Sequence, residues 1–436
     1  VVMNRERAMA PFSELDRRAA RISAPSRLVL LAGLLLVWPA LSSAQEARFG
    51  IAPSASTQRA LSDPPTQSQR DDEGLYAGVG VAYSQRSNVR RDSLDDGDGE
   101  SDSALVVTPR AGYKRFIGRH SAEVGVTTQF TRFQDFSDEN TETVTVNGLA
   151  NLDLTRILDV DLFASYTDTA EPRGGSGTRL VQDPEPDQVE ITGYGGVVTV
   201  GRRAARIQAE VGADRAQWRY QNNQQQFRDR DEDRLHGRVY YNVSPRTSVF
   251  IGAGLTDVSF ARQDLNLDSE EFSYEVGGRW DVGAKTTGEV SVGRTEKDFD
   301  NPAIADPDTT TLAGRLTWQA RPRTALSLYG SRQFEETTSV DDSFYVSELV
   351  GVSIDQSFGA RWNAFAYYNS TNDEYDSGRK DDITDYGVGL DYALRRWLSL
   401  GAQYSVVERE SNIPGNDYDD EIISLYLNGD FELGRR

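Results

Sequence analysis

The sequence offers few side chains for acid–base or nucleophilic catalysis at neutral pH. It contains no cysteine and two histidines, His120 and His236. A Ser-His-Asp site needs a histidine within reach of a serine, and no motif around either histidine predicts one. Arg234 and Arg238 flank His236 at the same-face spacing of a strand, so His236 should resist gaining a further charge. We therefore expect a protein that is not an enzyme and carries no cofactor.

An acidic run is the segment most similar to a metal site. Asp95-Asp96-Gly97-Asp98-Gly99-Glu100 resembles half of a calcium loop. It lacks the spacing and the final glutamate of an EF-hand, which supply the remaining ligands. A solvated acidic loop is the simpler interpretation, so we predict no metal site. The glycines from Gly193 to Gly196 precede no Lys-Ser/Thr pair, so they predict no phosphate loop.

The overall charge excludes another class of partner. The 436 residues include 47 basic and 68 acidic side chains, which give a net charge of −21. A nucleic-acid-binding surface needs clustered Lys and Arg, so no nucleic-acid partner is expected. The chain is too polar for a bundle of membrane-spanning helices. A membrane β-barrel remains compatible, because only one side of each strand faces lipid.

The N-terminus has the three-part layout of a secretory signal peptide. Arginines between Arg17 and Arg27 precede the apolar run Leu28–Val37, and the small residues Ser42-Ser43-Ala44 follow it. We predict that residues 1–44 are a cleaved signal peptide. An N-terminal membrane anchor is the alternative, although the run is shorter than the roughly 20 residues of a spanning helix. Residues 45–73 are rich in Pro, Ser, Gln and Asp and predict a flexible periplasmic leader.

From Gly74 onward, apolar and polar residues alternate with a period of two, the pattern of a strand with two different faces. In the first segment, 74–86, the apolar side carries Leu75, Ala77, Val79, Val81 and Tyr83. About 18 such segments follow one another to the last, 420–433, each near the 9–11 residues that a tilted membrane strand needs. We predict that residues 74–436 form an all-β, transmembrane, antiparallel up-and-down β-barrel of 16–18 strands.

The connections support this interpretation. Short turns rich in Arg, such as Arg321-Pro322-Arg323, alternate with long loops rich in Asp and Glu, such as 87–102. Short periplasmic turns and longer outer loops are typical of outer-membrane barrels. A soluble β-sandwich or a propeller also has short strands with turn signals. A sandwich has similar loops at both ends, and a propeller should repeat a motif in each blade, which this chain does not.

The polar side of each predicted strand should face the lumen if the apolar side faces lipid. The lumen-facing candidates are Glu210, Asp214, Arg234, His236, Arg238, Glu271, Glu275, Arg279, Arg315, Asp385 and Asp391. These charges have two interpretations: they stabilise the wall and plug the barrel, or they line a hydrated path for a polar solute. A barrel of this size is wide enough for an aqueous channel.

Three segments carry a family resemblance. They are the opening strand Gly74–Ser84, before an acidic loop, and the basic hairpins with a following apolar strand at Arg321–Gly330 and Leu394–Tyr404. The chain resembles the β-barrel porins encoded in bacterial exopolysaccharide operons, the family called putative β-barrel porin 2. The resemblance covers residues from about 74 to 436 and supplies no catalytic residue. It implies a role in moving or anchoring secreted polysaccharide at the outer membrane, with outer-membrane lipid, polysaccharide and export machinery as partners. One departure is that Phe431, the aromatic residue expected at the end, is followed by five more residues.

Three functional hypotheses follow. The first is a porin or export channel for a polar solute in the outer membrane of a Gram-negative bacterium, with exopolysaccharide as one candidate solute. The second is a non-conducting structural or surface-interaction barrel with acidic outer loops. The third is an outer-membrane enzyme that uses His236, for which the sequence offers no supporting motif.

Overall fold

The computed structural model describes residues 73–93, 99–177, 184–202, 205–282, 285–336 and 342–433. The predicted signal peptide and nearly all of the predicted leader lie outside this part, as do residues 95–98 of the acidic run. The elements are β1 (Gly74–Arg86), β2 (Asp102–Ile117), β3 (His120–Phe133), η3 (Ser137–Glu139), β4 (Thr141–Thr155), β5 (Leu158–Ala170), β6 (Gln188–Val200), β7 (Ile207–Tyr220), η4 (Gln225–Arg228), β8 (Arg230–Ser244), β9 (Thr247–Phe260), β10 (Ser269–Val282), β11 (Thr286–Phe299), β12 (Asp308–Arg321), β13 (Thr324–Glu336), β14 (Phe344–Phe358), β15 (Trp362–Tyr375), β16 (Lys380–Arg395), β17 (Leu398–Ser411) and β18 (Tyr418–Leu433).

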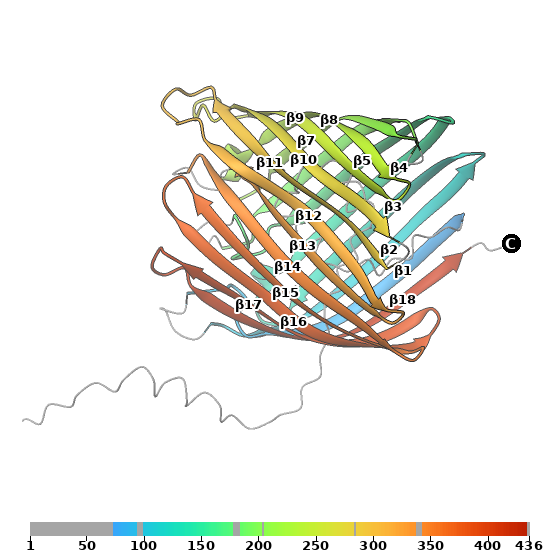
Figure 1. Ribbon diagram of the computed structural model, residues 1–436. Coiled ribbons are helices and arrows are strands. Elements are labelled where there is room, and N and C mark those ends of the chain that lie inside the picture. Colours follow the sequence, from blue (N-terminus) through green and yellow to red (C-terminus); the bar gives the residue numbers. More distant parts are fainter. Residues whose placement is uncertain are drawn as a thin grey trace, which may run out of the picture. The chain divides into compact units, whose positions relative to one another are not determined.

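The strands form one closed antiparallel sheet (Figure 1). Each strand pairs with its neighbours in sequence, and β1 pairs with both β2 and β18. The pair Leu75↔Leu433 lies at one end of the closing seam and Arg86↔Ile422 at the other. Closure gives every strand a paired neighbour on both sides, which is what a sheet within lipid requires. The 18-stranded antiparallel barrel confirms the predicted fold.

The period of two appears as two faces with opposite environments. On β8, Leu235 and Val239 are 52% and 48% exposed, whereas His236 and Arg238, which lie between them in sequence, are buried. The other strands likewise expose Val, Leu, Ile and aromatic side chains on the outward face. A water-soluble protein rarely exposes so large an apolar surface, because it would be buried in a core. The outward face of this barrel is therefore the face that contacts lipid.

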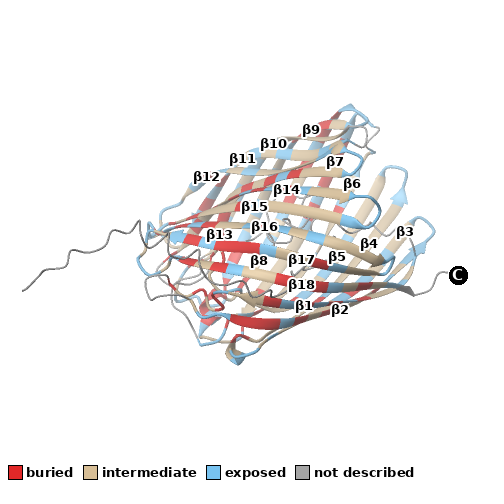
Figure 2. Ribbon diagram, turned by 90° about the horizontal axis from the view of Figure 1, so that it is seen from below, coloured by how far each residue is buried: buried red, intermediate tan, exposed pale blue. Residues whose placement is uncertain are grey.

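The two ends of the barrel differ in their connections. One end has short turns such as 118–119, 156–157 and 396–397, and the other has longer loops such as 171–187 and 221–229. The helices η3 and η4 are single 3-10 turns within two of these longer loops. Among the described residues, no helix is long and apolar enough to cross a membrane. Buried residues concentrate toward the long-loop end, away from the C-terminus (Figure 2).

The seam between β12 and β13 is shorter than its neighbours at the long-loop end. Its pairing begins at Leu312↔Arg332 and continues to Arg321↔Thr324. Residues 308–311 of β12 and 333–336 of β13 therefore do not pair with each other, although β11 pairs with residues 308–311 and β14 pairs with residues 333–336. The wall is consequently open in its backbone hydrogen bonding at this place.

Candidate functional site

The inner face of the barrel carries the polar residues that the sequence suggests as lumen-facing. Each of the eleven candidates lies on the strand face opposite the exposed apolar side chains. Side chains from β8 and β11 meet although β9 and β10 lie between them. Such contacts form only where side chains converge on the concave side of a curved sheet. The inner face is therefore the place where polar groups gather.

Four of the candidates form one network on β7, β8 and β10. The Arg238 Nε atom lies 2.6 Å from Glu275 Oε1, and Arg279 Nη1 lies 3.8 Å from Glu210 Oε1. Glu289 on β11, which the sequence interpretation missed, lies 2.7 Å from Arg238 Nη1 and joins the network. Each charge has an opposite charge beside it, as buried ionised groups require. The result is a rigid patch of alternating charge on the wall.

Aromatic rings lie beneath this patch. The Arg279 guanidinium lies 4.1 Å from the centre of the Tyr240 ring, and that of Arg238 lies 4.4 Å from the centre of the Phe250 ring. The Tyr240 hydroxyl donates a hydrogen bond to Glu210 at 2.9 Å. Cation–π stacking and charge-assisted hydrogen bonds both restrict the rotamers of these side chains. The patch is therefore held against the wall.

Two further candidates have partners that the sequence interpretation missed. Arg234 Nη2 lies 2.5 Å from Glu232 Oε2, and Arg230 Nε lies 2.9 Å from the other oxygen of Glu232. Glu271 Oε1 lies 2.9 Å from the Nζ atom of Lys297 on β11. Glu232 and Lys297 follow the same alternation as their strands' other inward residues. The signal for them was therefore present in the sequence.

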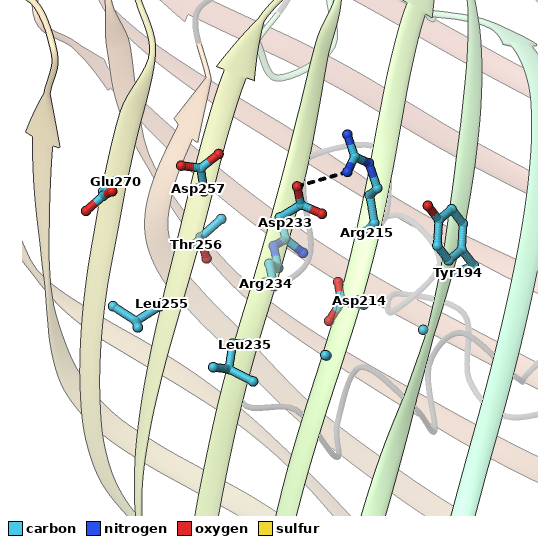
Figure 3. Close-up of a pocket in the computed structure, with 12 residues that line it drawn as sticks. Tyr194, Asp214, Arg215, Asp233, Arg234, Leu235, Leu255, Thr256, Asp257 and Glu270 are labelled. Atoms are coloured by element: carbon cyan, nitrogen blue, oxygen red, sulfur yellow. Dashed lines mark ion pairs between the residues drawn. The ribbon is translucent and has the colours of Figure 1, made fainter.

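Asp214 and His236 face each other on neighbouring strands. Asp214 Oδ1 lies 3.8 Å from His236 Nδ1, and the other ring nitrogen of His236 lies over Gly212, where an added Cβ would be 2.3 Å away. The ring therefore lies along the wall. Figure 3 shows Asp214 among the residues that line a pocket on β6–β10, together with the ion pair of Arg215 and Asp233, which belongs to the outward face of the same strands.

The remaining candidates lie away from this cluster. Arg315 on β12 stacks over the Tyr329 ring at 5.8 Å. On β16, Asp385 accepts a hydrogen bond from the Tyr367 hydroxyl at 3.2 Å, and Asp391 accepts one from Tyr426 at 2.6 Å. These two carboxylates lie on a part of the wall rich in tyrosine. The eleven candidates are thus distributed around the inner face, and no single site contains them all.

Residues 171–177, the described start of the loop between β5 and β6, reach the inner face on the far side of the barrel. The Ser176 hydroxyl donates a hydrogen bond to Asp373 on β15 at 2.6 Å, and the Gly177 N–H donates to the same carboxylate at 3.3 Å. Gly174 accepts a hydrogen bond from the Tyr418 hydroxyl of β18. On the closed ring, β15 stands almost opposite β6. The loop therefore crosses the interior, which the sequence interpretation did not foresee.

Two arginines, Arg173 and the buried Arg91, hold this crossing loop in place. Arg173 forms a two-bond contact with Glu139, at 2.7 and 2.6 Å, and Arg91 donates to the Arg173 carbonyl at 2.7 Å. Burial lowers the pKa of Arg91, but Tyr418 and Asp420 raise it, and the net pKa lies above the ordinary arginine value. The Arg91 guanidinium is therefore charged at neutral pH and can donate to the carbonyl of the loop.

Metal ions have no evident place in this arrangement. No cluster of three or more His, Asp or Glu residues within the described ranges could hold one. Several inward carboxylates instead have arginine, lysine or tyrosine partners, as in the pairs Arg238–Glu275, Lys297–Glu271 and Tyr426–Asp391.

The comparisons with known proteins agree with this geometry. A family model described as putative beta-barrel porin 2 matches residues 75–431. The chain belongs to this family. The family and the closed barrel together make it a porin-like barrel of the outer membrane, which confirms the resemblance noted in the sequence.

Solved structures of Pseudomonas aeruginosa proteins are also similar to this chain. OccK1 (OpdK) is 12% identical, with a TM-score of 0.45 over 82% of this chain and 99% of that one. OccK9 (OpdG) is 16% identical, with a TM-score of 0.45 over 84% and 100%. OccK2 (OpdF) is 11% identical, with a TM-score of 0.47 over 82% and 98%. No curated protein matches the sequence.

Proposed function

We propose that this barrel is a passive channel for a polar solute across the outer membrane of a Gram-negative bacterium. The observation that carries the proposal is the closed ring of strands with an apolar outer face and a charged inner face. A polar inner wall can hold water in the lumen and can form hydrogen bonds with a polar solute. Lipid offers the solute neither. The eleven inward residues named above are proposed to line this path.

The crossing loop supports a narrow rather than an open passage. Its contacts with Asp373 and Tyr418 place chain between opposite walls at the long-loop end. The inner face of β7–β11 carries both signs of charge in close pairs. Paired charges repel neither cations nor anions strongly at a distance. We therefore expect weak selectivity by charge and stronger selectivity by size.

Conductance of the full chain in planar lipid bilayers tests the channel. We expect discrete single-channel steps in the wild type. The double variant Arg173→Ala with Asp373→Ala removes two anchors of the loop, so its steps should be larger by roughly twofold, since the passage widens. The matched control is Asp382→Asn, an exposed carboxylate on the outward face of β16. A folded barrel that never conducts, in either form, would contradict the channel.

A non-conducting structural barrel is the second candidate, favoured by one observation. Lys297, Asp373 and Asp420 are fully buried near the long-loop end, which indicates dense packing there. The bilayer recordings distinguish the two, because this candidate predicts silence in the wild type and current only after the loop is released. In that case its acidic outer loops would provide the contact surface.

The finer predictions from the sequence enter here as proposals. Polysaccharide and its export machinery are candidate partners through the family resemblance alone, and no contact among the described residues favours a sugar over another polar solute. We also propose export through the signal peptide in residues 1–44. The intact mass of the mature protein checks this, with Gln45 as the expected first residue.

A further inference from the structure

The two ends of the barrel carry opposite charge. Every connection at the short-turn end has at least one Arg or Lys and no Asp or Glu in its sequence, as in Arg119, Arg156, Arg246 and Arg323. These four side chains are exposed. The long loops and the outward strand ends beside them are mainly acidic. The proposed channel depends on the inner face and does not account for a basic ring on the outside of one rim.

Aromatic side chains adjoin this basic ring on the outward face. Arg361 donates a hydrogen bond to the Tyr392 hydroxyl at 3.1 Å, and the Trp362 ring centre lies 4.5 Å from that of Tyr392. Arg206 lies 5.6 Å from the centre of the Tyr241 ring. Trp362 and Tyr241 are 46% and 45% exposed. The guanidinium groups thus lie just beyond rings that point outward into the surrounding membrane.

Exposed aromatic rings mark the depth of the lipid headgroups. Tyr and Trp prefer this level because their rings are apolar and their polar atoms are hydrated. A guanidinium group immediately beyond them is at the level of the phosphates, to which arginine binds with two parallel hydrogen bonds. The geometry of the Arg361, Trp362 and Tyr392 cluster therefore fits a phosphodiester whose acyl chains run along the outer wall.

We propose that the short-turn rim binds anionic phospholipids, with the ring of basic turns holding their headgroups. Charge complementarity favours this occupant over a zwitterionic lipid, because each turn supplies positive charge and none supplies negative charge. The basic ring then anchors the barrel at one leaflet, at a fixed depth. The proposal is independent of whether the barrel conducts.

Tryptophan fluorescence reports on this rim directly. Trp318, Trp362 and Trp397 are exposed on the outward face close to the short turns. Brominated phospholipids quench a tryptophan that they contact, so the full chain is refolded into vesicles that contain either brominated phosphatidylglycerol or brominated phosphatidylcholine in an unbrominated phosphatidylcholine background. We expect several-fold stronger quenching by the brominated phosphatidylglycerol than by the brominated phosphatidylcholine. Inorganic phosphate in the buffer should displace the anionic lipid no better than chloride does at equal ionic strength, because the site holds a lipid headgroup and not free phosphate.

A triple variant tests the basic turns themselves. Arg361→Gln, Arg395→Gln and Arg396→Gln neutralise two neighbouring turns without altering an inward residue. Each basic side chain near an anionic surface contributes about fivefold to binding, so the preference for the anionic lipid should fall on the order of tenfold or more. Retention of folding is checked by the heat-dependent shift of the barrel band in a denaturing gel.

The control has the same number of neutralised arginines at the other rim. Arg132, Arg294 and Arg332 lie on the outward face near the long loops, and their change to Gln should leave the preference unchanged. Equal quenching by both lipids in the wild type would overturn the proposal. A second outcome would also overturn the proposal: the triple variant keeps its preference for the anionic lipid, but the selectivity of its bilayer currents between anions and cations changes. The basic ring would then guide solutes and not hold lipid.

Discussion

Asp420 shows how the inner face accommodates a charge without water. The side chain is fully buried, and its oxygens accept hydrogen bonds from Arg86 Nε at 3.1 Å and from the Asn88 N–H at 3.3 Å. Arg91 Nε lies 3.5 Å from the same carboxylate. In this cluster the Asp420 carboxylate compensates the positive charges of both Arg86 and Arg91. Its loss leaves both guanidinium groups in a space built for an anion.

Replacement of Asp420 therefore tests the inner network at the scale of one residue. Asp420→Asn keeps the shape and removes the charge, so it should destabilise the barrel by roughly 3–5 kcal/mol. Urea unfolding in detergent, followed by tryptophan fluorescence, measures the change. Glu421→Gln, next in sequence but exposed on the outward face, is the control and should cost little. Similar losses in both variants would show that the burial of Asp420 is not what matters.

At the scale of elements, the open seam between β12 and β13 predicts where the wall exchanges its amide hydrogens first. Residues 308–311 and 333–336 each have a strand partner on one side only. Amides that lack a ladder partner should exchange about fivefold faster or more, since a net hydrogen bond contributes about 1 kcal/mol. Hydrogen–deuterium exchange of the refolded barrel measures this.

The matched segment for this experiment is Gly254–Val258 on β9, which pairs with both β8 and β10. Its amides should be strongly protected under the same conditions. If peptides from the open seam are protected as well as those of β9, the seam must be closed by hydrogen bonds in the membrane.

The strands themselves could be predicted well, for a physical reason. Each one separates lipid from a polar interior, so every second position must be apolar. The predicted first segment, 74–86, coincides with β1, and the predicted last segment, 420–433, lies within β18 (Tyr418–Leu433). The same alternation would have placed Glu289 and Lys297 on the inner face of β11, had it been applied to every strand.

The crossing loop could not be predicted in this way. Arg173 and Ser176 lie in a polar segment without a period, and Ser176 contacts Asp373, 197 residues away. A contact at that separation depends on the diameter and register of the closed ring, which local pattern does not encode. The open seam between β12 and β13 could not be predicted from the sequence either, because both strands keep the alternation of apolar and polar residues through it.

At the scale of the whole molecule, the exposed apolar band determines how the protein behaves outside a membrane. Side chains such as Ile251, Val276 and Val388 are 64%, 54% and 56% exposed around the ring. We expect the folded barrel to be monodisperse in detergent micelles and to precipitate when the detergent is removed. Light scattering during dialysis measures this. A folded monomer in plain buffer would contradict the assignment of this face to lipid.

The loop that links opposite walls also has a mechanical consequence. A cylinder made of one sheet resists stretching around its circumference, because each hoop is a chain of hydrogen bonds, but it flattens easily into an oval. The contacts of residues 174–177 with Asp373 and Tyr418 act as a brace across one mouth. Lateral pressure from the membrane should therefore distort the short-turn mouth, which has no such strut among the described residues, before it distorts the other.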